Sequence, residues 1–154
     1  MDAMNELIVA LGGKVGLIWI RSNEELRVER NLIPLADKLK YRLRRWTVTR
    51  GIVDVAEEAK GVQDRSEDRE LSTALESTLS SPERVMLLVY DGQPWLNDPM
   101  TLRCVKDAHN RLKTFAKTES KHIIFVDGNE PPKSIPGITA VDWPLPDRSV
   151  MSRI

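Results

Sequence analysis

The chain has 154 residues and carries 23 Lys and Arg against 23 Asp and Glu, so its formal net charge is zero. This length predicts a single domain over residues 1–154 with a sizeable core, and the balanced charge excludes a general attraction to nucleic acid or to membranes. One Cys excludes an internal disulfide and is typical of a reducing compartment, and one Cys with two His are too few for a zinc cage within one chain.

The longest apolar stretch covers residues 7–20, and it is interrupted by Gly12, Gly13 and Lys14. It is too short to span a bilayer, which takes about 20 apolar residues. Asp2 and Glu6 stand where a signal peptide needs positive charge. We therefore predict a short helix, a glycine turn and a buried strand, in a protein of the cytoplasm or of an organelle stroma.

Five short apolar runs predict the strands of one sheet. Because several runs are apolar throughout, they indicate strands covered on both faces, and the long charged connections between them indicate helices. We expect a three-layer α/β sandwich with a mainly parallel five-stranded sheet, in the strand order of P-loop ATPases and with the first strand central. The runs are Val15–Ile20, Arg45–Thr49, Arg84–Tyr90, His122–Val126 and Ile138–Trp143.

The first helix after the first strand is predicted from the sequence Ser22-Asn23-Glu24-Glu25, in which Ser22 and Glu25 form a capping box. Its apolar positions continue towards Tyr41. Pro34 lies within it, and because proline removes a helical hydrogen bond and clashes with the preceding turn, we expect a kink or a break there.

The following segment, Ile52–Asp68, is rich in acids and predicts an exposed, mobile excursion. A second helix is predicted from about Glu67 to Leu79, where Ser81-Pro82 ends it.

The third helix has the clearest signals, because Asp98 is a good N-cap and Pro99 suits the first helical position. The proline-containing loop Gly128–Gly137 is expected to be irregular. A helix beginning near Asp147 would be cut off at Ile154, so we expect the chain to continue in its natural parent.

The strand Met86–Asp91 ends as a nucleotide site does, since P-loop ATPases carry their magnesium-binding Asp after such a strand. Gly92 follows, however, in place of the Glu that polarises the attacking water. The earlier strand leads into Arg21–Glu25 instead of a glycine-rich loop with a Lys. Gly12-Gly13-Lys14 lies before that strand, at the wrong end of the sheet for phosphate.

Glu24 and Glu25 occupy the predicted helix N-terminus, where they suit the helix dipole but would repel a phosphate. The chain thus has the architecture of a nucleotide-binding domain without its chemistry, and we predict that it is not an enzyme by itself and binds no cofactor.

Three acids, Asp91, Asp127 and Asp142, each follow an apolar run and should lie at the carboxyl edge of the sheet, where ligands bind in α/β folds. Asp91 and Asp127 could hold Mg²⁺ in a phosphoryl-transfer enzyme or nuclease. The alternative is that they cap turns, because Asp91-Gly92 and Asp127-Gly128 are turn dipeptides.

A basic run, Lys38–Trp46, and the lysines and arginines of the third helix offer a nucleic-acid-binding alternative, which we rank below a protein partner. The same cations suit a helix end and a solvated helix face. His109 and His122 have no evident partner, and Cys104 is interpreted as an ordinary helix residue.

Trp95 and Leu96 lie in an apolar loop before the third helix, and Trp143 stands among prolines after the last strand. Tryptophans on loops are enriched at contact surfaces, so these three residues are candidates for binding a protein partner. Packing over the end of the sheet is the equal alternative.

Several residue blocks, spread over nearly the whole chain, carry a family resemblance through their order and spacing. The blocks are Met4–Leu7, Ile20–Leu26, Arg45–Gly51, Tyr90–Pro99, Ile135–Ile138 and Asp142–Asp147. They resemble the N-terminal domain of the AAA-type ATPases that occur as a conserved reading frame in cyanobacteria and in red-algal chloroplast genomes. The acidic stretch Asp54–Glu70 and Pro34 depart from a typical member of this family.

The resemblance implies a degenerate P-loop domain followed in the parent by an intact AAA module, which would bind ATP and Mg²⁺. It implies partner recognition or packing within a ring for this domain, with the AAA module, another protein or further copies of the chain as partners. A cytoplasmic or chloroplast-stromal location follows from the same resemblance.

Overall fold

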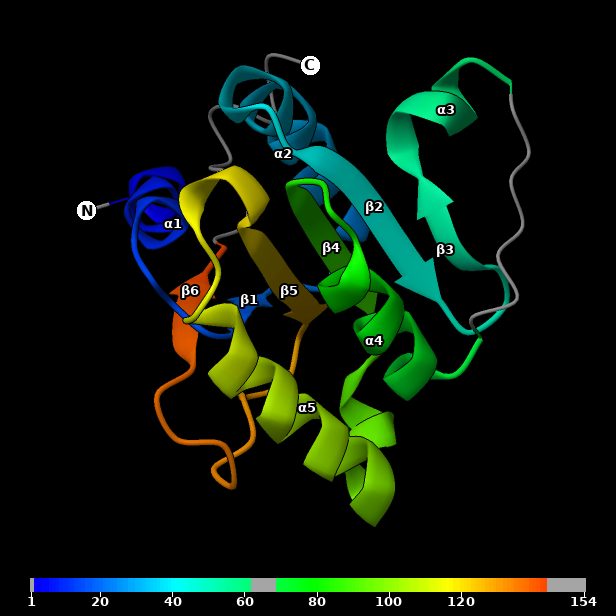
Figure 1. Ribbon diagram of the computed structural model, residues 1–154, viewed down its shortest axis with the longest axis vertical. Helices are drawn as coiled ribbons and strands as arrows, with labels where there is room; N and C mark the ends of the chain where they lie inside the picture. The colour runs from blue at the N-terminus through cyan, green and yellow to red at the C-terminus, as the bar shows by residue number, and fades with distance from the viewer. Residues whose placement is uncertain (1, 62–68, 144–154) are drawn as a thin grey trace, which may run out of the picture.

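The computed structural model describes residues 2–61 and 69–143. Within these residues six strands form one sheet in the order β3-β2-β4-β5-β1-β6 (Figure 1). No helix in the described residues is long and apolar enough to cross a membrane. The strands are β1 (Ile18–Arg21), β2 (Arg42–Thr47), β3 (Gly51–Asp54), β4 (Val85–Tyr90), β5 (Lys121–Asp127) and β6 (Thr139–Asp142).

The sheet is mixed, because β3 pairs antiparallel with β2 while the other neighbouring strands are parallel. The prediction of five strands was wrong by this one: the chain reverses through a tight turn at residues 48–50, and Gly51 has the left-handed φ of 68° that favours glycine. β3 and a short helix α3 (Val55–Ala59) thus replace the first part of the predicted exposed excursion. The rest, residues 62–68, lies outside the described residues.

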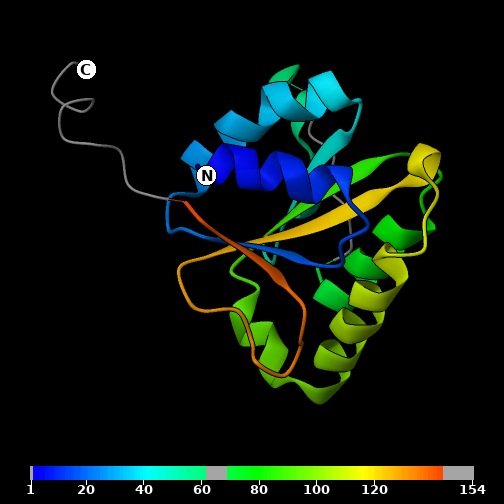
Figure 2. The same ribbon diagram turned by 90° about the vertical axis from the view of Figure 1, so that its left-hand side faces the viewer.

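The first strand is an inner strand but not the central one, because β1 lies between β5 and the edge strand β6. The five predicted runs are all confirmed as strands, with ends that differ by a few residues. The three-layer α/β fold is confirmed as well: Figure 2 shows helices on both sides of the sheet.

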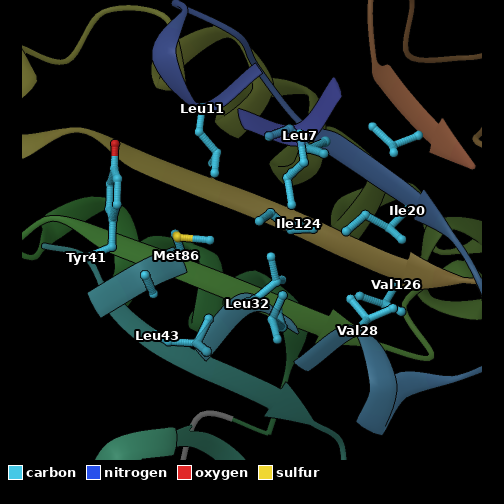
Figure 3. Close-up of a cluster of buried hydrophobic side chains, with 14 of the residues drawn as sticks. Leu7, Leu11, Ile20, Val28, Leu32, Tyr41, Leu43, Met86, Ile124 and Val126 are labelled. Atoms are coloured by element: carbon cyan, nitrogen blue, oxygen red, sulfur yellow. The ribbon is translucent and has the colours of Figure 1, made fainter. Parts of the chain in front are cut away.

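Strand β4 shows why both faces are covered. All six of its residues are buried, and alternate side chains enter two separate cores. Met86 and Leu88 face the helices α1 (Ala3–Gly12) and α2 (Glu25–Leu39), whereas Leu87 and Val89 face α4 (Leu71–Ser80) and α5 (Pro99–Leu112). This alternation follows from the two-residue period of a strand. Figure 3 shows the first core, with Leu7, Leu32 and Ile124 among its residues.

Helix α5 confirms its sequence signals, since the Asp98 carboxylate accepts hydrogen bonds from the Thr101 N–H at 2.9 Å and from the Thr101 hydroxyl at 2.8 Å. Helix α4 begins at Leu71, later than predicted. Loop 128–137 is irregular, as expected. The predicted helix near Asp147 lies outside the described residues.

Two details of α2 differ from prediction. The Ser22 hydroxyl accepts from the Glu24 N–H at 3.0 Å, so the predicted capping box is not formed. The Ser22 N–H donates to the Asp127 carbonyl, which keeps Ser22 beside β5 and delays the helix until Glu25. Pro34 does not break the helix. It has no N–H to donate to the Arg30 carbonyl, but Pro34 and Arg30 both lie on the exposed face, where water can bind that oxygen.

Candidate functional site at the carboxyl edge of the sheet

The connection between β1 and α2 occupies the place of a phosphate-binding loop. It consists of Ser22, Asn23 and Glu24, and it is held close to the sheet by the hydrogen bond from Ser22 to Asp127. No glycine occurs in it, whereas a phosphate cradle needs backbone N–H groups exposed by a glycine-rich turn. A hollow of about 320 Å³ lies beside this connection, bordered also by Gly128, Glu130 and Trp143.

Arg21 is the cation that lines this hollow, and its guanidinium is paired with acidic side chains. It forms ion pairs with Glu130 and with Asp142, the last residue of β6, which lies opposite Arg21 in the register of β1 and β6. The hydrogen bond to Asp142 raises the pKa of Arg21, against the opposing effect of burial, and the same bond lowers the pKa of Asp142. The guanidinium of Arg21 therefore has carboxylate partners from two different segments of the chain.

Asp127 caps a turn, as one of the two sequence interpretations required. Its carboxylate accepts from the backbone N–H of Asn129 at 2.9 Å and from the Asn129 side-chain amide at 2.8 Å. A Cβ at Gly128 would lie 2.2 Å from the Asn23 side-chain oxygen, so any larger residue there would displace that side chain. The side chain of Asn23 thus closes over the turn after β5.

Asp91 is exposed and adopts the left-handed φ of 54°, in keeping with a turn after β4. Like Asp127, Asp91 influences the carboxyl group of Glu25. Burial raises the pKa of Glu25, and the negative charges of Asp91, Glu29 and Asp127 raise it further. The edge is therefore negative around the start of α2. Among the described residues, no group of three or more His, Cys, Asp and Glu side chains is arranged to hold a metal ion.

A buried polar network, which sequence reasoning missed, fixes α2 on the sheet. The Tyr90 hydroxyl donates to the Glu29 carboxylate at 2.6 Å, and Arg45 donates to both Glu29 oxygens at 3.1 and 3.2 Å. Arg45 also pairs with Glu58, to which Arg50 donates at 2.9 Å. Glu29 is only 7% exposed.

The pKa values in this network follow from its contacts. Burial and the Glu29 hydrogen bond raise the pKa of Tyr90, and the hydrogen bond from Arg45 lowers the pKa of Glu58. Burial alone would lower the pKa of Arg45, but its two carboxylate partners raise it overall. The only sequence signal was the place of Glu29 beside Val28 on the buried stripe of α2.

The three predicted contact residues differ in accessibility. Leu96 is buried in the core beneath α5, and Trp143, 7% exposed, is buried in the core beneath α1 and α2. Trp95 is half-buried and meets the Trp46 ring edge-on at 5.5 Å between centroids. Met100, which the sequence did not single out, is 73% exposed in the same segment. Packing over the end of the sheet thus describes Leu96 and Trp143, while Trp95 and Met100 remain at the surface.

The arginines of the basic run 38–46 are paired with acids. Arg42 pairs with Glu83 at 2.8 Å and with Asp54 at 3.4 Å, and the charge of Glu83 is the main reason for its raised pKa. Arg44 lies within 4 Å of the same two acids. Within this run, Lys38 and Lys40 remain exposed, so the positive charge of the arginines is largely balanced and that of the two lysines is not.

Both histidines have structural partners. The Leu17 N–H donates to His109 Nδ1 at 3.0 Å, and burial lowers the pKa of His109. His122 Nε2 lies 3.0 Å from the Tyr41 hydroxyl, and burial, with the nearby charge of Arg84, lowers its pKa to about 4. Cys104 is a free, half-buried thiol on α5.

The protein is thus a three-layer α/β domain. At the carboxyl edge of its sheet, a short acidic connection, covered by the side chain of Asn23, stands where a phosphate-binding loop would be. Residues 3–138 match the family model described as the SpoVK-like AAA ATPase, N-terminal domain. The chain belongs to this family. No curated protein and no solved structure matches the chain.

Proposed function

We propose that the chain is a non-catalytic recognition or regulatory domain of an AAA-type ATPase. It binds a protein partner or packs against the ATPase module, in an assembly that can include further copies of itself. The observation that carries this proposal is the connection after β1, where Ser22, Asn23 and Glu24 replace a phosphate loop and Arg21 is paired with Asp142 and Glu130.

Electrostatics at this edge support the same proposal. A nucleoside triphosphate would meet Glu24 and Glu25 at the start of α2. Burial raises the pKa of Glu25, and the charges of Asp91, Glu29 and Asp127 raise it further, which indicates a negative local field. An anion placed there gains from the helix dipole but is repelled by these carboxylates. ATP and Mg²⁺ belong, in this proposal, to a separate AAA module of the parent protein.

The contact surface that we propose is the segment formed by Pro94, Trp95 and Met100. Pro94 and Met100 are exposed, and Trp95 is half-buried, with its ring at an edge-to-face angle to that of Trp46. A partly packed tryptophan and an exposed methionine in one short segment combine a rigid with an adaptable apolar side chain, as protein interfaces do.

The test uses the parent ATPase with Met100→Ser, because Trp95→Ala would also remove packing on Trp46. We expect an unchanged melting temperature and at least a several-fold change in partner affinity, assembly size or ATPase rate. Val9→Ser is the matched control, since Val9 is 64% exposed on α1, away from this segment. Equal behaviour of both variants and the wild type would refute the contact surface.

A metal-dependent phosphoryl-transfer activity or nuclease activity is the second candidate. One observation favours it: Asp91 and Asp127 both act on the carboxyl group of Glu25, so these strand-end acids share one electrostatic environment. A divalent cation would relieve their mutual repulsion.

We further propose that the parent ATPase is of the cyanobacterial and chloroplast type and works in the cytoplasm or stroma. The residue blocks at the ends of β1 and β4, Ile20–Leu26 and Tyr90–Pro99, support this assignment. A search of sequenced genomes for the full gene tests it, and a gene confined to other lineages would refute it.

A further inference from the structure

A second hollow lies at the opposite, amino edge of the sheet, away from the connection after β1. It has a volume of about 640 Å³, a size typical of small-molecule sites, and the ends of α1 and α5 meet there with the beginnings of β4 and β5. In Figure 1 the segment that leads into β5, drawn in yellow, lies beside α1. We call this hollow the amino-edge cavity.

The charged residues of the amino-edge cavity are all cations. Lys14, Arg84, Lys117 and Lys121 line it, and no Asp or Glu is among the described residues that do so. Lys14 and Lys117 are exposed at its rim. This imbalance contrasts with the chain as a whole, whose formal net charge is zero.

Lys121 is the most unusual of these cations, because it is only 1% exposed. Its ammonium donates to the Glu119 carbonyl at 2.6 Å and lies 4.5 Å from the centre of the Phe115 ring. Within the described residues no carboxylate lies at ion-pair distance from it, and burial lowers its pKa against the opposing charge of Glu119. A buried charge without an opposite charge is costly, so an anion near Lys121 would offset that cost.

Arg84 offers a second donor that is not fully used. Its guanidinium lies over the Tyr41 ring, 4.1 Å from the ring centre, and its Nε is buried without a hydrogen-bond partner among the described residues. The Tyr41 hydroxyl lies 2.8 Å from the Ser120 hydroxyl. Figure 3 shows that Tyr41 stands at the end of the apolar cluster with its hydroxyl directed towards β5. Arg84, Tyr41 and Ser120 thus bring polar groups to one wall of the cavity.

Helix dipoles explain only part of this charge. The helices α1 and α5 end at the cavity, and cations such as Lys14 and Lys117 stabilise helix C-termini. A helix dipole does not account for the burial of Lys121 at the start of β5 or for the unpartnered Nε of Arg84. The remainder of the lining is largely apolar, with Ile8, Leu11, Val15, Leu39, Leu112 and Phe115.

We propose that the amino-edge cavity binds a small amphipathic organic anion, whose carboxylate or phosphate group meets the cations and whose apolar part packs among the apolar side chains. A simple inorganic anion would leave the apolar wall unused, and a neutral lipid would leave the cations without a partner. The site is independent of the proposed contact surface, which lies at the carboxyl edge of the sheet.

The test is isothermal titration of the chain with octanoate and with octyl phosphate, followed by amide NMR spectra. We expect binding of at least one of these anions, with shifts at Gly12, Gly13 and Lys14, and the tighter binder identifies the head group. Sulfate and 1-octanol are the comparison ligands. The proposal would be overturned if sulfate or 1-octanol bound as tightly as the octyl anions, or if neither octyl anion bound.

The variant is the double substitution Lys14→Gln and Lys117→Gln, which changes only exposed side chains and should fold normally. We expect at least a tenfold loss of affinity. The matched control is Lys38→Gln with Lys133→Gln, which makes the same change of net charge at exposed positions outside the lining. An equal loss in both double variants would show a general charge effect and refute a specific site.

Discussion

Glu29→Gln tests whether the buried network holds α2 on the sheet. The substitution keeps the size of the side chain but replaces the carboxylate, which accepts hydrogen bonds from Tyr90 at 2.6 Å and from Arg45 at 3.1 and 3.2 Å, with a neutral amide. A glutamine oxygen in the place of Oε1 can still accept from Tyr90 and from Arg45, but the amide N–H groups in the place of Oε2 then face the Arg45 guanidinium. Arg45 cannot adapt, because a guanidinium has no acceptor.

The magnitude follows from two limits. Hydrogen bonds to charged groups contribute about 1.5–3 kcal/mol, and breaking a fully buried ion pair costs about 3–5 kcal/mol. Arg45 keeps Glu58 as a partner and its side chain is 14% exposed, so the loss should fall below the second range and in the upper part of the first. We therefore expect the free energy of unfolding to fall by about 2–3 kcal/mol, which lowers the melting temperature by roughly 5–10 °C.

The assay is urea unfolding followed by tryptophan fluorescence, with the midpoint and the slope fitted separately. Glu24→Gln is the matched control, since Glu24 makes a partly exposed pair with Arg27 at 2.7 Å, a kind of pair that contributes about 0–1 kcal/mol. A double-mutant cycle with Tyr90→Phe isolates the coupling. If Glu29→Gln destabilises no more than Glu24→Gln does, the reasoning about this network is refuted.

Two further predictions concern the histidines. Gly16→Ala should lower the free energy of unfolding by about 1–3 kcal/mol, because its Cβ would lie 2.1 Å from His109 Nδ1, whereas Gly12→Ala, with nothing within 4 Å, should be neutral or slightly stabilising in the same urea assay. Burial and the charge of Arg84 lower the pKa of His122 from 6.5 to about 4, so between these values the unfolded chain binds a proton that the folded chain does not. Stability should therefore fall on acidification, on the order of 2 kcal/mol by pH 5, and an NMR titration that finds His122 protonating near pH 6.5 would contradict this cause.

The strands could be predicted from sequence because their signal is local. Runs such as Val85–Tyr90, buried at every position, need no knowledge of their neighbours. β3 was missed because it depends on the turn before Gly51, which lets four residues pair with β2. The uninterrupted helix through Pro34 depends on which face meets solvent, and that is set by packing on the sheet.

At the candidate site, the missing phosphate loop could be predicted from the sequence, whereas most of the side-chain contacts could not. The absence of a glycine-rich loop after β1 and the acids at the start of α2 are readable from Ser22 to Glu25. The partners are not, because Arg21 meets Glu130 and Asp142 more than a hundred residues away in the chain. The burial of Leu96 and Trp143 follows from tertiary packing for the same reason.

The most direct test of the account is the melting temperature of the chain with and without ATP, Mg²⁺ and Mn²⁺, for the wild type and for Asp91→Asn. A ligand at a hundred times its Kd would add about 2.7 kcal/mol to the stability, a shift that is easily measured. The account predicts no shift for ATP with either metal ion, because the connection after β1 offers no phosphate cradle. A shift of several degrees in the wild type that is lost in Asp91→Asn would contradict it and show that the strand-end acids form a working metal site.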